Sequence, residues 1–150
     1  MPLRQIDISK KEVVYREATA TGRIRLKRET IGLIKKGALE KGDPIALAAA
    51  SSVLATKQTP NMVVLAHPLK IERTEPKIVV GKDWVDVTVT VAAHDKTGVE
   101  MEALTAVAIA LLNIWDVVKS HEKDTDGQYP TTSIESIRVT KKVKSTTEAA

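Results

Sequence analysis

The sequence predicts an α+β fold: an antiparallel sheet covered by helices on one face. Three segments carry this prediction. Residues 16–27 alternate between apolar and polar side chains, which is the period of a strand with one polar face. Residues 69–80 and 84–93 are two further strand patterns around a short loop that contains glycine, which predicts a hairpin. Residues 99–122 form a long, strongly apolar helix pattern.

The elements before the hairpin follow in order. Residues 1–13 are expected to be an extended arm, because their apolar side chains are too sparse to set a period. A helix is expected over 29–39 and a second, alanine-rich helix over 45–56. Between them, Asp43 is suited to cap the second helix and Pro44 to occupy its first turn.

The remaining segments complete the pattern. Residues 62–68 are apolar and end in His-Pro, so we expect a buried segment closed by a restrained turn. Pro76 places the first hairpin strand at a sheet edge or a bulge. The last strand is expected over 133–143, and the polar tail, residues 145–150, is expected to fray.

This order of elements is a βαββαβ pattern with one extra helix, typical of a ferredoxin-like sandwich. The length of 150 residues fits one such domain, which we place at 14–144.

The amino-acid composition excludes several classes of functional site. The chain has no Cys, which excludes disulfides, thiolate metal sites and cysteine nucleophiles. Only 3% of its residues are aromatic, so base-stacking platforms for single-stranded nucleic acid are scarcely available. The formal net charge of +4 favours an anionic ligand and is too small to indicate nucleic acid.

We expect neither a membrane span nor a secretory signal. The most apolar run, 103–118, is shorter than the ~20 residues that cross a bilayer and is interrupted by Thr105, Asn113 and Asp116. The first residues contain no apolar stretch of the signal-peptide type. A cytoplasmic location is therefore expected.

The long helix is apolar on nearly every side. A helix that covers a sheet in a monomer keeps a polar stripe, so this one is expected to be buried both by its own sheet and by another subunit. The alternative is a helix enclosed within one chain. Asp116 and Lys119 share one face of it, and this pair is either an ordinary surface ion pair or functional, because Asp116 interrupts the most apolar stretch.

Four stretches concentrate reactive groups beside glycine, proline or apolar residues. Each also has an ordinary explanation: a capped turn, a core histidine, helix capping or a surface ion pair. They are Lys41-Gly42-Asp43-Pro44, Leu65-Ala66-His67-Pro68, Lys96-Thr97-Gly98-Val99-Glu100-Met101-Glu102 and Asp116 with Lys119.

Together these stretches resemble, in order and spacing, the cyclic pyranopterin monophosphate synthase family, the MoaC proteins of molybdenum cofactor biosynthesis. The most specific motif is the run KTGVEMEALTA, residues 96–106. The resemblance extends from Ile6-Asp7-Ile8-Ser9 to the last strand, which is nearly the whole chain.

The resemblance implies a homohexamer, a trimer of dimers, that acts on (8S)-3′,8-cyclo-7,8-dihydroguanosine 5′-triphosphate. A radical S-adenosylmethionine GTP cyclase would supply this substrate, and the products would be cyclic pyranopterin monophosphate and pyrophosphate. No tightly bound cofactor is expected. Mg²⁺ on the substrate triphosphate is the one metal considered, and the sequence offers no protein site for it.

Matching positions carry the family's site residues onto this chain. The catalytic residues implied are Lys41, Asp116 and Lys119; the substrate-binding residues implied are Leu65, Ala66, His67, Glu100, Met101 and Glu102. Two positions depart from the family. Ala66 stands where many members carry Cys, and Thr19 stands where many carry an arginine, whose phosphate-binding role Arg23 or Arg25 could take.

Helix geometry predicts a site shared between chains. Glu102 and Asp116 are fourteen positions apart, which is about 21 Å along a helix. We therefore expect Asp116 and Lys119 to meet Lys41, His67 or the glutamates of a neighbouring chain. The alternatives are a non-catalytic basic module that binds nucleotide or RNA, and a degenerate family member retained for assembly.

Overall fold

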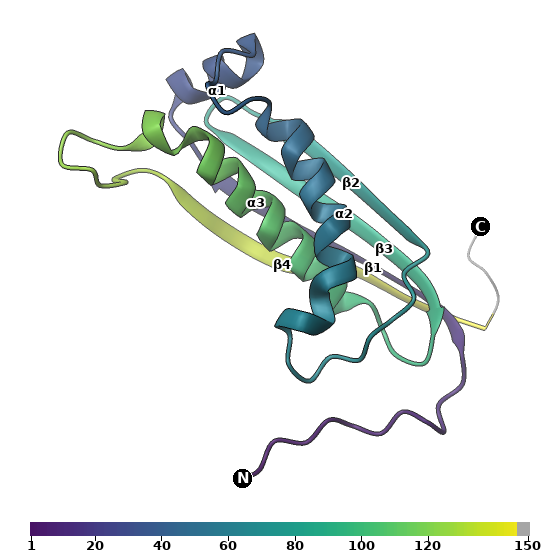
Figure 1. The fold of residues 1–150 in the computed structure, drawn as a ribbon. Helices are drawn as coiled ribbons and strands as arrows, with labels where there is room; N and C mark the ends of the chain where they lie inside the picture. Colours follow the sequence, from purple (N-terminus) through teal and green to yellow (C-terminus); the bar gives the residue numbers. More distant parts are fainter. Residues whose placement is uncertain (147–150) are drawn as a thin grey trace.

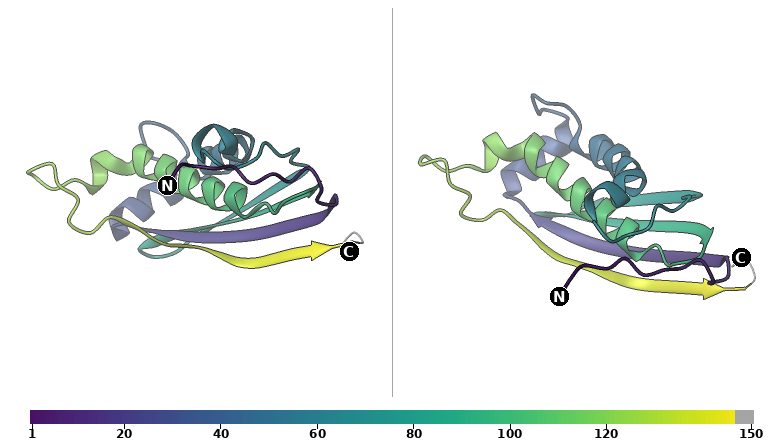
Figure 2. Two further views of the ribbon diagram at one scale, coloured as in Figure 1. Left: turned by 90° about the horizontal axis from the view of Figure 1, so that it is seen from below. Right: turned by 60° about the horizontal axis from the view of Figure 1, so that its bottom comes forward.

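A computed structural model describes residues 1–146. Seven elements follow in chain order: β1 (Val14–Arg25), α1 (Arg28–Lys36), α2 (Pro44–Met62), β2 (Arg73–Val80), β3 (Trp84–Asp95), α3 (Glu100–Glu122) and β4 (Ser133–Ser145). The strands form one antiparallel sheet in the order β2-β3-β1-β4, with α2 and α3 on one face of it (Figures 1 and 2). The predicted α+β, ferredoxin-like fold is confirmed.

The alternation in β1 separates the two faces of the sheet. Ala18, Ala20 and Ile24 are fully buried beneath the helices. The intervening threonines face the open side, where Thr19 and Thr21 exchange hydroxyl hydrogen bonds of 2.8 and 3.0 Å with threonines of β3. This pattern explains why β1 lies at the centre of the sheet, paired on both sides.

The hairpin lies where the sequence predicts it. The N–H of Gly81 donates to the carbonyl of Trp84 at 2.8 Å and closes the turn between β2 and β3. β2 is an edge strand. It accommodates Pro76 because a residue at the edge can lack an N–H donor without breaking the hydrogen bonds of the sheet.

The second helix begins as predicted and ends later. The carboxylate of Asp43 accepts a 2.9 Å hydrogen bond from the N–H of Ile45, and Pro44 is the first helical residue. The helix then continues through Pro60 to Met62, past the predicted end at residue 56. Proline is tolerated there because the helix is ending, and the N–H of Val63 still reaches the carbonyl of Thr59 at 2.9 Å.

The prediction that residues 62–68 are buried is wrong. Met62, Val64 and Leu65 are exposed, and His67 is half-buried. The segment leaves the end of α2 and turns below it toward β2, at the end of the sandwich rather than between its layers (Figure 1).

Helix α3 is enclosed from two sides within one chain, by the sheet and by α2. By length and composition alone α3 could cross a membrane, but half of its apolar window is buried in this fold, as for a core helix. One stripe stays uncovered: Met101 is 41% exposed and Leu112 54%. The enclosed-helix alternative thus accounts for part of the apolar surface, and a second subunit on the remaining stripe stays a prediction.

Two predicted boundaries concern the ends of the chain. Residues 1–13 contain no helix or strand and run as an arm along the body (Figure 1). β4 extends to Ser145, and most of the tail expected to fray, residues 147–150, lies outside the described residues.

Candidate active site

The three residues implied as catalytic meet at one end of α3. The Oδ1 of Asp116 lies 3.1 Å from the Nζ of Lys41 and 3.1 Å from the Nζ of Lys119. Lys41 also donates to the backbone carbonyl of Asp116 at 3.2 Å. We call these three residues the lysine cluster. Lys41 belongs to the same chain as Asp116, so this contact does not require a neighbouring chain.

Local structure presents Lys41 to α3. Gly37 ends α1 in the left-handed conformation, with φ of 66°, and turns the chain into the loop that carries Lys41. The next residues cap α2 through Asp43, which holds the loop at its other end. Asp116 and Lys119 lie one turn apart on α3, so all three side chains converge.

The lysine cluster carries a net positive charge. Hydrogen bonds from Lys41 and then Lys119 lower the pKa of the Asp116 carboxyl, so it stays ionised between two ammonium groups. The cluster borders an open pocket of about 380 Å³ whose walls include Leu112, Trp115 and Tyr129. Two cations beside an apolar wall can bind a phosphate-bearing ligand and exchange protons with it.

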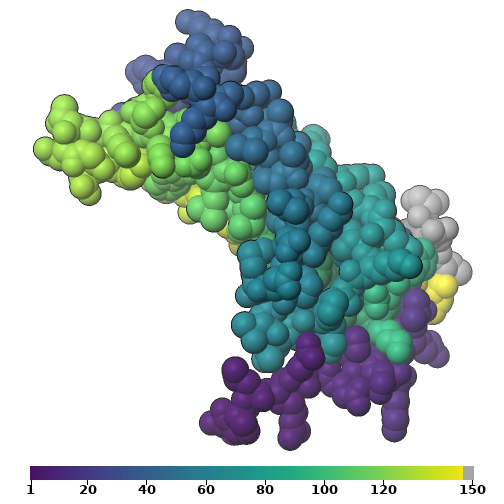
Figure 3. Space-filling view, viewed as in Figure 1, coloured from purple at the N-terminus to yellow at the C-terminus, as the bar shows by residue number. Residues whose placement is uncertain are grey.

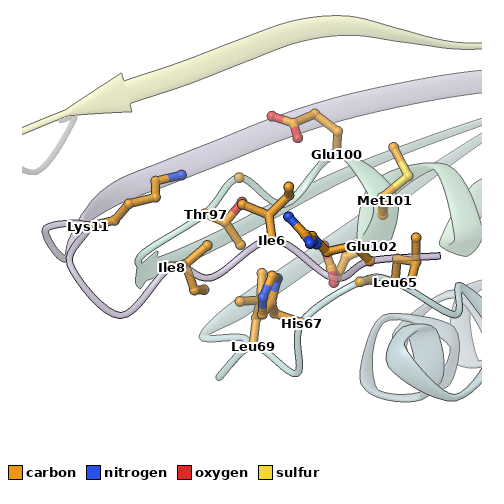
Figure 4. Close-up of a pocket in the computed structure, with 13 residues that line it drawn as sticks. Ile6, Ile8, Lys11, Leu65, His67, Leu69, Thr97, Glu100, Met101 and Glu102 are labelled. Atoms are coloured by element: carbon orange, nitrogen blue, oxygen red, sulfur yellow. The ribbon is translucent and has the colours of Figure 1, made fainter. Parts of the chain in front are cut away.

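The six residues implied as substrate-binding gather at the other end of α3. They line a cavity of about 370 Å³, which we call the arm cavity because the N-terminal arm forms one of its sides (Figure 4). The body of the protein contributes Leu65, Ala66, His67, Leu69, Thr97, Gly98, Glu100, Met101 and Glu102. The arm contributes Arg4, Ile6, Ile8 and Lys11. Sequence reasoning gave none of these four arm residues a role, although the resemblance began at Ile6.

The loop between β3 and α3 is held in place by hydrogen bonds from β1. The buried guanidinium of Arg16 donates to the carbonyls of Asp95 and Lys96, at 3.3 and 3.2 Å. Glu100, in the first turn of α3, forms a 3.0 Å ion pair with Lys142 of β4. Sequence reasoning also missed Lys142, because only the fold brings β4 beside the start of α3.

Glu102 is the most perturbed acid of the site. Its side chain is only 2% exposed, and burial raises the pKa of its carboxyl from 4.5 to about 7, with Glu100 and Asp95 adding to the effect. A carboxyl with such a pKa can give or take a proton near neutral pH.

The lysine cluster and the arm cavity do not meet within one chain. They occupy opposite ends of α3, about 21 Å apart by helix rise. The chain therefore brings the three implied catalytic residues together, and the six implied binding residues together, but not the two groups.

Both arginines suggested as substitutes at Thr19 are paired with carboxylates. Arg23 is bound to both carboxylate oxygens of Asp86, at 2.6 and 2.9 Å, and Arg25 to Glu135 at 2.8 Å. Both border a pocket of about 330 Å³ on the open face of the sheet, and neither lines the arm cavity or the pocket beside the lysine cluster. The suggestion is not supported.

A candidate metal centre is absent from the described part of the chain: residues 1–146 contain no group of three or more His, Asp or Glu side chains placed to hold an ion.

Comparison with known proteins gives a consistent picture. Residues 5–145 match the model of the MoaC family. The chain is 51% identical over 142 residues to a probable cyclic pyranopterin monophosphate synthase of Thermococcus kodakarensis, covering 95% of this chain and 91% of that protein. It is 52% identical over 139 residues to a protein of the same name from Aeropyrum pernix, covering 93% and 95% respectively. The chain therefore belongs to the MoaC family.

Proposed function

We propose that this protein is a cyclic pyranopterin monophosphate synthase. It converts (8S)-3′,8-cyclo-7,8-dihydroguanosine 5′-triphosphate to cyclic pyranopterin monophosphate and pyrophosphate by acid–base catalysis. The observation that carries the proposal is the lysine cluster, in which residues from two distant segments converge on one carboxylate. The names of relatives that are about half identical to this chain over most of their length support it.

The lysine cluster supplies the proton transfers. Ring opening and ring closure each move protons, and attack of a ribose hydroxyl on phosphorus forms one P–O bond while the P–O bond to pyrophosphate breaks. Lys41 and Lys119 act as acid and base in these steps, and their remaining positive charge stabilises the departing pyrophosphate. Asp116 orients both ammonium groups through one oxygen.

The arm cavity binds the purine-derived ring. His67, Glu100 and Glu102 offer polar groups to ring N–H and carbonyl positions, between the apolar side chains of Leu65 and Met101. Because the pKa of Glu102 lies near 7, its carboxyl can present either a donor or an acceptor to the ring at neutral pH.

The complete site is shared between two subunits. The uncovered stripe of α3 runs from Met101, beside the arm cavity, through Leu112 to Asp116 in the lysine cluster. A second chain packed antiparallel on this stripe would bring its lysine cluster to the first chain's arm cavity, in a two-fold arrangement. We propose that such dimers assemble as a trimer of dimers, the homohexamer implied by the family.

The cellular setting follows from the same proposal. The substrate comes from a radical S-adenosylmethionine GTP cyclase, Mg²⁺ accompanies its triphosphate, and no other cofactor is required. The enzyme works in the cytoplasm on a small molecule, without a nucleic acid or membrane partner.

The direct test incubates the protein with the cyclised dihydro-GTP and measures pyrophosphate and a pterin product. Lys119→Met is expected to lower kcat by about 10²-fold or more while substrate still binds. Lys82→Met, at an exposed position of the β2–β3 turn that lines neither pocket, is the matched control and should keep full turnover. Full turnover by Lys119→Met, or salt-dependent binding of generic polynucleotide without turnover, would contradict the proposal.

Mixed oligomers test the shared site separately. Lys119→Met disables the lysine cluster and His67→Ala the arm cavity. When the two variants are refolded together, each mixed dimer should contain one site in which both halves are intact. Random mixing should then restore about one quarter of wild-type turnover if each site draws on two chains. No recovery would place the whole site within a single chain.

A further inference from the structure

The N-terminal arm crosses the arm cavity as an extended segment without helix or strand structure. It runs along the outer surface below the ends of α2 and α3, and only its far end joins β1 (Figures 1 and 3). In Figure 4 it passes along one side of the cavity, and Ile6 and Ile8 of the arm lie beside Thr97, His67 and Leu69 of the body.

Few contacts hold the arm in this position. Gln5 donates from Nε2 to the carbonyls of Leu65 and Ala66 at 3.4 and 3.3 Å, and Lys96 donates from Nζ to the carbonyl of Ser9 at 3.1 Å. Of the residues before β1, only Ile8 is even half-buried, and Ile6 keeps 68% of its surface exposed. Weak, solvent-exposed hydrogen bonds and little apolar burial are properties of a segment that opens at low cost.

The contacts of the arm are made with the substrate-binding segments themselves. Gln5 is bound to the two residues that precede His67, and Lys96 begins the KTGVEME run. Displacement of the arm therefore uncovers the mouth of the cavity, and its return places new side chains against whatever occupies the cavity.

The arm also changes the charge of the cavity. The ionisable residues that the body contributes to the lining are His67, Glu100 and Glu102, and Glu100 already has a partner in Lys142. Arg4 and Lys11, both on the arm, are the two arginine or lysine side chains in the described lining. Without the arm, a phosphate-bearing ligand would face a lining that contains carboxylates and one histidine.

We propose that residues 4–11 form a strap that opens to admit the substrate, closes over it, and places Arg4 and Lys11 on its phosphate groups. This inference rests on the proposed function for the identity of the substrate. Ile6 and Ile8 then cover the ring of the substrate. Arg4 and Lys11 pair with the negative charge of its phosphate groups, which the glutamates of the cavity would repel.

A pair of neighbouring variants tests the strap. Lys10 and Lys11 are both exposed, and only Lys11 lines the cavity, so Lys10→Met and Lys11→Met make the same change in charge and bulk. With GTP as the probe in titration calorimetry, Lys11→Met should weaken binding about tenfold, the loss expected for one charge-assisted hydrogen bond. Lys10→Met should differ from wild type by less than about twofold.

Limited tryptic digestion tests the closure. Trypsin cleaves after Arg4, Lys10 and Lys11 in the open arm, and after exposed Lys82 in the β2–β3 turn as an internal reference that lines neither pocket. Saturating GTP should slow cleavage in the arm about tenfold relative to cleavage at Lys82, if the closed strap dominates in the complex.

The outcomes separate this inference from the proposed function. Equal GTP affinity for Lys10→Met and Lys11→Met, unchanged cleavage of the arm in saturating GTP, or failure of the wild type to bind GTP would each overturn the strap. None of these readouts requires turnover. Absence of turnover of the cyclised dihydro-GTP, with protection of the arm intact, would refute the proposed function and leave the strap standing.

Discussion

Glu102 is expected to destabilise the folded protein at neutral pH, so Glu102→Gln should stabilise it. Burial raises the pKa of the carboxyl to about 7, whereas an exposed glutamate titrates near 4.5. Between these values the folded state binds more protons than the unfolded state, so the free energy of unfolding falls as pH rises. The cost is about 1 kcal/mol at pH 5 and about 3 kcal/mol at pH 8, because each tenfold change in proton affinity is worth about 1.4 kcal/mol.

Glutamine is neutral at every pH and similar in size, so the variant escapes this cost. Urea unfolding of both proteins at fixed concentration, from pH 5 to pH 8, should show the advantage of Glu102→Gln growing by about 2 kcal/mol. Glu100→Gln is the control: that side chain is paired with Lys142, and its replacement should bring no stabilisation. An advantage that does not depend on pH, or a variant less stable than wild type at pH 8, would refute the assignment of a buried, reluctantly ionised carboxyl.

Three further predictions concern the scaffold. In Gly22→Ala the new Cβ would lie 2.8 and 2.9 Å from side chains of α3, so thermal and urea unfolding should show a loss of about 1–3 kcal/mol, whereas Gly32→Ala, in an open helical position, should gain about 0.5–1 kcal/mol. Glu122→Ala leaves the buried hydroxyls of Thr30 and Thr132 and the half-buried N–H of Lys27 without their carboxylate, and should cost about 3–5 kcal/mol in urea unfolding. Exposed Glu40→Ala should change the free energy of unfolding far less, and equal losses would contradict this account. Arg16→Met removes the donors that fix the loop before α3 and should raise KM for the substrate more than it lowers kcat; the opposite split in steady-state kinetics would be evidence against a positioning role.

Local periodicity predicted most of the fold correctly, because a strand with one buried face and a long core helix leave repeating patterns in the sequence. It failed at residues 62–68, where an apolar run lies on the surface at the end of α2. An apolar run indicates a preference for burial, but only the arrangement of the layers decides whether anything covers it. The end of α2 was also misplaced. A proline indicates that a helix is ending, but it does not say whether the helix stops before it or, as at Pro60, a few residues after it.

The candidate site was predictable in its parts and not in its assembly. Motifs identified Lys41 and Asp116 separately, but their contact joins a loop to a helix 75 positions later in the chain. The role of Lys142 depends on the position of β4 beside β1, which no short-range pattern encodes. The extended arm was predicted but its part in the cavity was not, because a segment that lies extended on a surface shows no periodicity that indicates what it contacts.

The T-shaped contact between Trp115 and Tyr129, with ring centroids 5.1 Å apart, gives the protein a built-in optical reporter. Both rings line the pocket beside the lysine cluster, and the second tryptophan, Trp84, lies under Arg23 on the open face of the sheet. A Trp84→Phe variant would therefore carry a single indole, placed at the pocket. Its fluorescence would follow occupancy of that pocket in real time, without any attached label.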